Sequence, residues 1–179
     1  MKIEILYILL FPLLSFLIQL FLPARYDKVK VYISTFIIFI CVCLSYISLM
    51  NTYVERGEDN ATTFSYKWIS LQNLTIDFNI IFDAMAIIML LVVSLVSFLV
   101  HIFSIDYMHG DKRFSRYFAY LGLFTFSMYG IVLSNNLFLT FIFWELVGVS
   151  SFLLIGFWYE KESAGNAAKK AFIVNRIGD

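Results

Sequence analysis

Glu145 places an ionisable carboxyl near the centre of an apolar run, Leu137–Tyr159, that is long enough to cross a bilayer. An acidic side chain at that depth costs about 2.5–3.5 kcal/mol on insertion scales, and such residues usually mark an ion or proton pathway. The sequence therefore predicts that Glu145 takes up and releases a proton within the membrane. A second interpretation stays open, in which the carboxyl pairs with a cation only to tie two helices together.

Charged residues recur in the final segment, which follows a short polar turn at 160–163. Two helices joined by so tight a turn must be antiparallel neighbours. At ~1.5 Å per residue, Glu145 and Asp179 both lie roughly 21–22 Å from that turn, Arg176 roughly 18 Å and Lys170 roughly 9 Å. We therefore expect an acid from each helix at one depth, with two cations spaced toward the turn.

Helical spacing then sorts these residues by face. Glu145 shares its face with Gly148, Phe152 and Gly156. Small residues let a neighbouring helix approach closely, so the carboxyl is expected to point into a bundle and not at lipid. On the final segment Lys169 and Arg176 share a face, whereas Lys170 points away from Asp179.

This arrangement predicts a proton switch. Burial favours the protonated carboxyl and a nearby cation favours the charged one, so moving or neutralising a lysine would load or unload Glu145. Two interpretations stay open for three further residues. Asp83 is an interfacial acid or a transport group, His101 an interfacial histidine or a proton relay, and Lys169 an inner-surface anchor or a member of the charged network.

No metal site is predicted. Asp106, His109 and Asp111 are read as a solvated loop. Cys41 and Cys43 have no second Cys or His pair at metal-ligand spacing, so they are read as packing or lipid-facing residues.

Composition makes lipid the expected solvent for the elements that position these groups. The 179 residues are 61% hydrophobic with a mean hydropathy of +0.83, whereas soluble domains hold about 45–50% apolar residues. Basic and acidic residues number 13 each, so no nucleic-acid partner is expected.

Charge-poor windows predict an all-α polytopic membrane protein of about six transmembrane helices, because lipid offers no partner for exposed backbone polar groups. The windows are Ile5–Leu22, Val31–Met50, Ala84–Val100 (extended by Ile80–Asp83 and His101–Phe103), Tyr117–Leu133, Leu137–Tyr159, and a sixth from Ala164 to Asp179. The first is read as a retained helix and not a signal peptide, since its apolar stretch is too long and no cleavage site follows.

Loop charges predict the orientation. One side of the membrane carries Lys2, Arg56 and Lys67, and the other carries Arg25, Lys28, Lys30, Lys112, Arg113, Arg116 and Lys161. The richer side is expected inside, which places the N-terminus outside. In the long outer loop, Asn51–Asn79, alternation across Thr63–Ile69 predicts a short strand or hairpin, and an aromatic anchor at the membrane surface is the alternative.

Five motifs resemble the distal antiporter-like membrane subunit of respiratory complex I, often called subunit 5. They are FSRYFAYLGLFTFSM (114–128), LSNN (133–136), WELVG (144–148), LLIGFW (153–158) and AAKKAFIVNRIGD (167–179). The large subunit of multisubunit cation/proton antiporters is similar through the Trp-Glu-Leu and Leu-Leu-Ile-Gly segments. Val147-Gly148 and Asn175–Asp179 favour complex I.

The resemblance implies that Glu145 is the membrane-embedded acid of a first half-channel, with Lys170, Arg176 and Asp179 in the same charged network. It implies two stretches, residues 1–79 (two helices and an outer loop) and residues 80–179 (the start of the antiporter-like domain). The family has about 14–16 helices, so this chain resembles only its N-terminal portion. A fragment, a split subunit or a truncated sequence would explain the difference.

The expected function is that of a proton-translocating subunit of NADH:quinone oxidoreductase, with a cation/proton (Na⁺/H⁺) antiporter subunit as the alternative. No redox motif is seen in this chain, and the resemblance assigns NADH, FMN, iron–sulfur clusters and quinone to other subunits. The expected partners are lipid, neighbouring membrane-arm subunits, above all the adjacent antiporter-like one, and the rest of its own subunit. The expected location is an energy-transducing membrane, with the bacterial cytoplasmic membrane favoured over the mitochondrial inner membrane.

Overall fold

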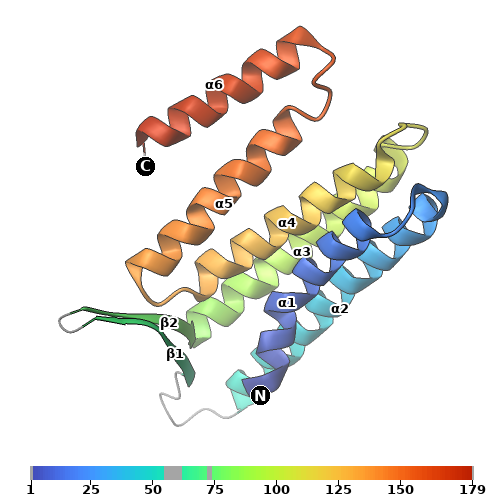
Figure 1. Cartoon of the computed structure of the whole chain (residues 1–179). Helices are drawn as coiled ribbons and strands as arrows, with labels where there is room; N and C mark the ends of the chain where they lie inside the picture. Colours follow the sequence, from blue (N-terminus) through green and yellow to red (C-terminus); the bar gives the residue numbers. More distant parts are fainter. Residues whose placement is uncertain (1, 55–61, 72–73, 179) are drawn as a thin grey trace.

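Six helices and one hairpin make up the chain in the computed structural model, which describes residues 2–54, 62–71 and 74–178. The elements are α1 (Lys2–Phe21), a 3₁₀ turn (Ala24–Tyr26), α2 (Asp27–Val54), β1 (Thr62–Leu71), β2 (Leu74–Phe82), α3 (Ala84–Tyr107), α4 (Phe114–Leu133), α5 (Leu137–Ile155) and α6 (Glu162–Gly178). Helices α1–α4 form an antiparallel bundle, α5 packs on α4, and α6 packs on α5 (Figure 1).

Three of the helices, α2, α3 and α5, are long and apolar enough to cross a membrane by length and composition, and α1 contributes a shorter apolar stretch. Their positions follow the charge-poor windows, with two corrections at the ends. Ile80–Phe82 belong to β2 and not to the third helix, because the Asp83 carboxylate caps the first turn of α3 by accepting from Ala86 N at 2.7 Å. The fifth helix ends at Ile155, four residues early, where Gly156 begins a turn.

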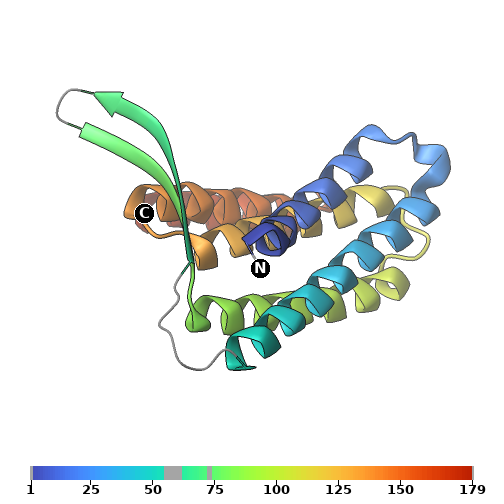
Figure 2. The same ribbon diagram turned by 90° about the horizontal axis from the view of Figure 1, so that it is seen from below.

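The predicted hairpin is confirmed: β1 and β2 pair antiparallel, with an irregularity in register between Lys67 and Ile69. It projects from the end of the bundle (Figure 2). Its return strand is tied to the turn that starts α5, because Asn136 Nδ2 donates to Asp77 O at 2.6 Å and Asn135 N donates to Asn79 O at 3.1 Å. The hairpin therefore fixes where α5 begins.

The apolar core lies where α1, α3, α4 and α5 meet the end of β2. Its buried members include Ile8, Leu90, Tyr129, Leu133 and Phe143. Gly130 of α4 abuts the Phe143 ring so closely that a Cβ at Gly130 would lie 2.1 Å from ring carbon Cδ1. This contact lets α5 lie close against α4. Cys41 is buried, as the packing interpretation predicts.

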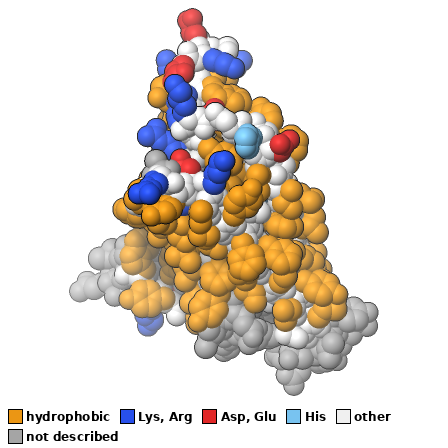
Figure 3. Space-filling view, turned by 90° about the vertical axis from the view of Figure 1, so that its right-hand side faces the viewer, with side chains coloured by type: hydrophobic (Ala, Val, Ile, Leu, Met, Phe, Trp, Pro, Cys, Tyr) orange, Lys and Arg blue, Asp and Glu red, His pale blue; other side chains and the backbone are white. Residues whose placement is uncertain are grey.

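Charged side chains gather at one end of the molecule. The α1–α2, α3–α4 and α5–α6 connections all lie at that end (Figure 1), and Figure 3 shows most of the visible charges there, above a largely hydrophobic surface. The seven residues of the richer basic count lie in these connections or in the first turn of the helix that follows. We call this end the basic end. The structure thus confirms that these three loops lie at the same end of the molecule. That this end faces the inside of the membrane stays a prediction.

Candidate functional site

An ion pair between α5 and α6 forms the centre of the site. Glu145 lies near the middle of the 19-residue α5, and its carboxylate Oε1 pairs with Nη1 of Arg176. The Glu145 side chain is 20% exposed and that of Arg176 is 52% exposed. Counting residues from the turn predicts that Glu145 and Arg176 lie within one side-chain length of each other in depth. In the structure their side chains are in contact.

Close approach of the two helices depends on the small residues of the Glu145 face. A Cβ at Gly156 would lie 3.1 Å from Ala168 Cβ, and one at Gly148 would lie 3.8 Å from Asn175 Nδ2. Ala168 is buried in this contact. The predicted close packing is thus confirmed, and the carboxyl faces α6.

An aromatic pair lies beside the ion pair, toward the basic end. The Phe152 and Phe172 rings are 5.5 Å apart, and the Arg176 guanidinium carbon lies 5.7 Å from the centre of the Phe172 ring. Phe172 therefore contacts Phe152 of α5 and also supports the Arg176 side chain on its own helix, α6. A cation above a ring face gains about 0.5–1 kcal/mol at an exposed site.

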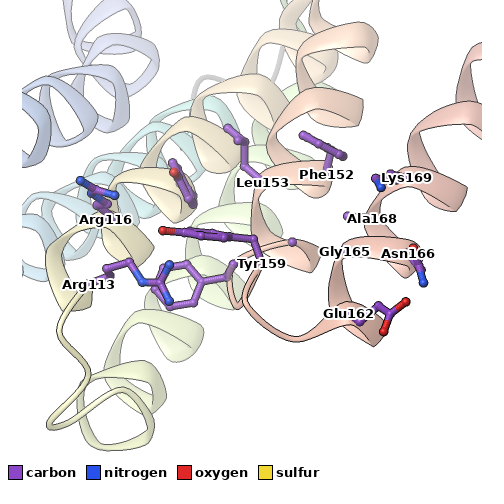
Figure 4. A pocket seen from close by; sticks show the side chains of 13 residues that line it. Arg113, Arg116, Phe152, Leu153, Tyr159, Glu162, Gly165, Asn166, Ala168 and Lys169 are labelled. Carbon is purple, nitrogen blue, oxygen red and sulfur yellow. The ribbon is translucent and has the colours of Figure 1, made fainter.

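A cavity of about 510 Å³ opens between α4, α5 and α6 at the basic end, on the other side of Phe152. Its lining includes the cations Arg113, Arg116 and Lys169, with Phe152 and Gly156 contributed by the Glu145 face of α5. In Figure 4 the Arg113 side chain lies against the Tyr159 ring, and the two are 4.4 Å apart from guanidinium carbon to ring centre. Phe152 thus belongs both to the cavity lining and to the aromatic pair beside the Glu145–Arg176 ion pair.

Lys170, another predicted member of the network, lies apart from the ion pair. Lys170 is exposed and makes no ion pair among the residues that the structure describes. It shares the outer face of α6 with Ile173, Val174 and Ile177, all more than half exposed. The predicted matching depth of Asp179 falls outside the described residues. The roles of Lys170 and Asp179 stay predictions.

Asp83 and His101 have structural positions that the sequence interpretation did not foresee. Asp83 caps α3 at the hairpin end, and its transport role stays a prediction. The His101 side chain is fully buried against Phe118 of α4, and its role as interfacial residue or relay stays a prediction. Its Nδ1 lies 2.8 Å from Ser97 O, so Nδ1 carries the proton and donates.

Asp106 and His109 are exposed, as the prediction of a solvated loop requires, whereas Asp111 is half-buried in a contact between two connections. Its carboxylate accepts from Trp158 Nε1 at 3.0 Å and from Arg113 N at 2.8 Å, and Arg113 in turn pairs with Glu160 at 3.3 Å. These contacts join the α3–α4 loop to the α5–α6 turn. The Arg113 backbone amide, then Trp158, then the Arg113 charge hold the pKa of Asp111 below its ordinary value of 3.8.

This contact should loosen in acid. A carboxylate whose pKa is lowered in the folded state contributes stability that is complete above its ordinary pKa and is lost as pH falls through the folded value. We therefore expect hydrogen-exchange protection of residues 108–113 and 156–161 to hold down to pH about 3.8 and to fall below it. The Asp111→Asn variant should show no such pH dependence. Equal acid loosening in that variant would assign the effect to another group.

Comparison with known proteins was made by sequence and by fold. Residues 68–118 match the family described as "NADH-Ubiquinone oxidoreductase (complex I), chain 5 N-terminus", and residues 134–179 match "NADH:quinone oxidoreductase/Mrp antiporter, TM". These two matches cover the end of β1, all of β2 and α3, the α3–α4 loop and both helices of the ion pair.

Curated relatives carry consistent names. The chain is 46% identical over 140 residues to NAD(P)H-quinone oxidoreductase subunit 5, chloroplastic, of Anthoceros angustus, which covers 78% of this chain and 18% of the relative. It is 50% identical over 133 residues to NAD(P)H-quinone oxidoreductase subunit 5, organellar chromatophore 1, of Paulinella chromatophora. That match covers 74% of this chain and 20% of the relative. The chain thus spans about a fifth of the length of these relatives.

A solved structure shares the fold. The membrane-bound sulfane sulfur reductase, an archaeal respiratory membrane complex, contains a chain that superposes with a TM-score of 0.73 at 16% identity, over 99% of this chain and 34% of that one. With the apolar helices, this likeness supports a membrane-embedded architecture. On these matches, the chain belongs to the family of antiporter-like subunit 5 proteins of NAD(P)H-quinone oxidoreductases.

Proposed function

We propose that this chain moves protons across an energy-transducing membrane as part of a quinone-reducing complex of the NADH:quinone oxidoreductase class. The Glu145–Arg176 pair carries the proposal, because it sets a proton-binding carboxyl against a cation in the middle of the apolar helix α5. Relatives of the chain are named as subunits of such a complex. Electron transfer by other subunits would supply the driving force.

The exchange of Arg176 between two positions is the proposed switch. In one position the guanidinium pairs with Glu145, and in the other it leaves this carboxyl without its cation partner. Arg176 is half exposed and lies on the Phe172 ring, so its side chain has room to move without breaking the α5–α6 contact. Lys170 and Asp179, with Lys169 at the cavity, are proposed as further members of the network.

Access to Glu145 is proposed from the basic end. The cavity lined by Arg113, Arg116 and Lys169 reaches Phe152, which lies two helical turns from Glu145 along α5. The rings of Phe152 and Phe172 are proposed as an apolar barrier between the cavity and Glu145. Water would reach the carboxyl only when this pair separates, which would couple proton uptake to movement of α6.

The second candidate is a subunit of a multisubunit cation/proton antiporter, which is favoured by the match of residues 134–179 to a family that includes both classes. The chain 5 match and the names of the curated relatives support the quinone-linked class. Transport that needs an electron donor and quinone supports the first candidate. Transport driven by a sodium gradient alone supports the second.

Partners and location follow from the same family. We propose neighbouring membrane-arm subunits, above all an adjacent antiporter-like one, together with lipid and the remainder of a full-length subunit. NADH or NADPH, FMN, iron–sulfur clusters and quinone would be bound by other subunits. The two relatives described above are named for a chloroplast and a chromatophore, so a photosynthetic energy-transducing membrane stands beside the bacterial and mitochondrial alternatives.

The Glu145→Gln variant tests this function in membranes that hold the assembled complex. We expect quinone reduction to continue and the number of protons moved per electron to fall, because glutamine fills the same space without binding a proton. Proton uptake by inverted vesicles measures the ratio. Asp106→Asn, the same carboxyl-to-amide change at an exposed residue of α3, is the matched control and should leave the ratio unchanged. An unaltered ratio in Glu145→Gln would leave the ion pair a purely structural role.

A further inference from the structure

A polar stripe runs along the buried face of α3, away from the ion pair. Ser94, His101 and Ser104 are each at most 1% exposed, and Ser97 lies on the same face at helical spacing. The opposite face carries Leu95, Val96 and Leu99, which are about half exposed. Four polar side chains thus turn inward from an apolar helix, and their burial is costly unless they are hydrogen-bonded.

The stripe is joined to α2 and α4 by hydroxyl contacts. Ser97 Oγ lies 2.6 Å from Thr125 Oγ1, and Ser94 Oγ lies 2.6 Å from Tyr129 Oη and 3.1 Å from Ser45 Oγ. His101 Nδ1 lies 2.8 Å from Ser97 O and 3.5 Å from Ser97 Oγ. From Ser104 to Ser94 the stripe covers ~15 Å, half of a bilayer core, from near the basic end to mid-helix.

The donors in the first part of this series point one way. Thr125 Oγ1 donates to Leu121 O at 2.9 Å, so its contact with Ser97 is one in which Ser97 donates. His101 Nδ1–H in turn faces the Ser97 carbonyl and hydroxyl. The order of donation is therefore His101, Ser97, Thr125, leading away from the basic end.

The second ring nitrogen of His101, Nε2, is an acceptor without a hydrogen-bond partner in the part of the chain that the structure describes. Since Nδ1 carries the proton, Nε2 has a free lone pair, and it is buried without a hydrogen-bond partner among the described residues. A buried acceptor left unpaired costs about 1–3 kcal/mol. The Nε2 lone pair can therefore accept a proton. His101 stands at the start of the series of hydroxyl groups described above, so it is placed to pass a proton on to them.

We propose that His101 is the receiving group of a second proton relay, one that runs through the α2–α3–α4 bundle from the basic end to the Ser94–Tyr129–Ser45 cluster. A proton bonds to Nε2, and the Nδ1 proton passes to Ser97 Oγ as the Ser97 hydroxyl proton passes to Thr125 Oγ1. The ring ends neutral in its other tautomer. A bridging water carries the proton from Thr125 to Tyr129, one turn further along α4. The relay rests on the proposed proton-moving function.

The test uses the assembled complex in membranes and the two histidines of the sequence. His101→Asn keeps a donor for Ser97 O and removes the group that binds a second proton, so protons moved per electron should fall while quinone reduction continues. His109→Asn, the same change in the exposed α3–α4 loop, should leave the ratio unchanged. A wild-type ratio in an assembled His101→Asn complex would overturn the relay.

A second pair of variants decides the matter if His101→Asn does not assemble. Thr125→Val keeps the shape and removes the hydroxyl, and Thr125→Ser keeps the hydroxyl. We expect a lower ratio in the valine variant only. Equal wild-type ratios in both would refute the relay. Glu145→Gln in the same assay separates the two proposals. A lower ratio in Thr125→Val but not in Glu145→Gln would retain the relay and refute the ion-pair switch. A lower ratio in Glu145→Gln but not in Thr125→Val would retain the ion-pair switch and refute the relay.

Discussion

The Arg176→Glu variant is expected to remove most of the subunit from the assembled complex. The change takes away the cation that pairs with Glu145 and puts a second carboxyl beside it, in the middle of the α5–α6 contact. Breaking a buried ion pair costs about 3–5 kcal/mol. An exposed pair contributes only about 0.2–1 kcal/mol, and the Arg176 side chain is half exposed, so we expect about 2 kcal/mol for the charge reversal, on the order of a 30-fold shift in a folding equilibrium.

Native gel analysis of solubilised membranes measures this loss. The double variant Glu145→Arg with Arg176→Glu restores an opposite-charge pair between the helices and should recover part of the assembled subunit. Lys112→Glu, the same reversal at an exposed loop cation, should assemble normally. Full assembly of the Arg176→Glu variant would show that the pair contributes nothing to the packing of α6.

The Gly130→Ala variant has the second largest expected effect. A methyl group at Gly130 would lie 2.1–2.3 Å from three carbons of the Phe143 ring, well inside contact distance. The ring cannot move away freely, since it is buried in the core and packs edge-to-face on Phe126 at 5.6 Å. Overpacking of this kind costs about 1–3 kcal/mol. We expect a lower midpoint of thermal unfolding and less assembled subunit.

Matched variants identify the cause. Gly165→Ala makes the same change in α6, where the nearest atom to the new methyl would be Tyr159 O at 4.0 Å, and it should be neutral or slightly stabilising. Phe143→Leu makes room, so the double variant Gly130→Ala with Phe143→Leu should lose less stability than the sum of the two single changes. Strict additivity would show that the contact between Gly130 and Phe143 is not the source of the loss.

Sequence reasoning located the ion pair because the geometry there is simple. Two helices joined by a tight turn keep their residues at depths set by distance from the turn, so counting at ~1.5 Å per residue is enough to bring Glu145 and Arg176 together. The hairpin was also predictable from alternation alone. Even the cap on α3 carries a recognisable pattern, an Asp directly before an apolar run, which the window count overlooked when it extended the helix through Asp83.

The burial of His101 and the Asp111–Trp158 bond needed the structure. Hydropathy identifies a membrane helix without saying which face meets lipid, so His101 read as an interfacial residue although the polar residues three and four positions apart on α3 indicate an inward face. Asp111 and Trp158 are 47 residues apart and lie in different connections. Which loop packs on which turn depends on the arrangement of all the helices, and no local pattern specifies it.

Lys30 shows how one cation can serve at two stages in the life of a membrane protein. In the folded chain its side chain is 4% exposed, with Nζ 2.8 Å from Asp27 and 3.1 Å from Leu22 O, where it closes the last turn of α1. Before α1 and α2 pair, the same ammonium is a free loop charge that biases the direction of insertion. Lys30 becomes buried only when α1 and α2 pack together. On the predicted orientation, its charge therefore acts on the direction of insertion first and on the packing of the two helices afterwards.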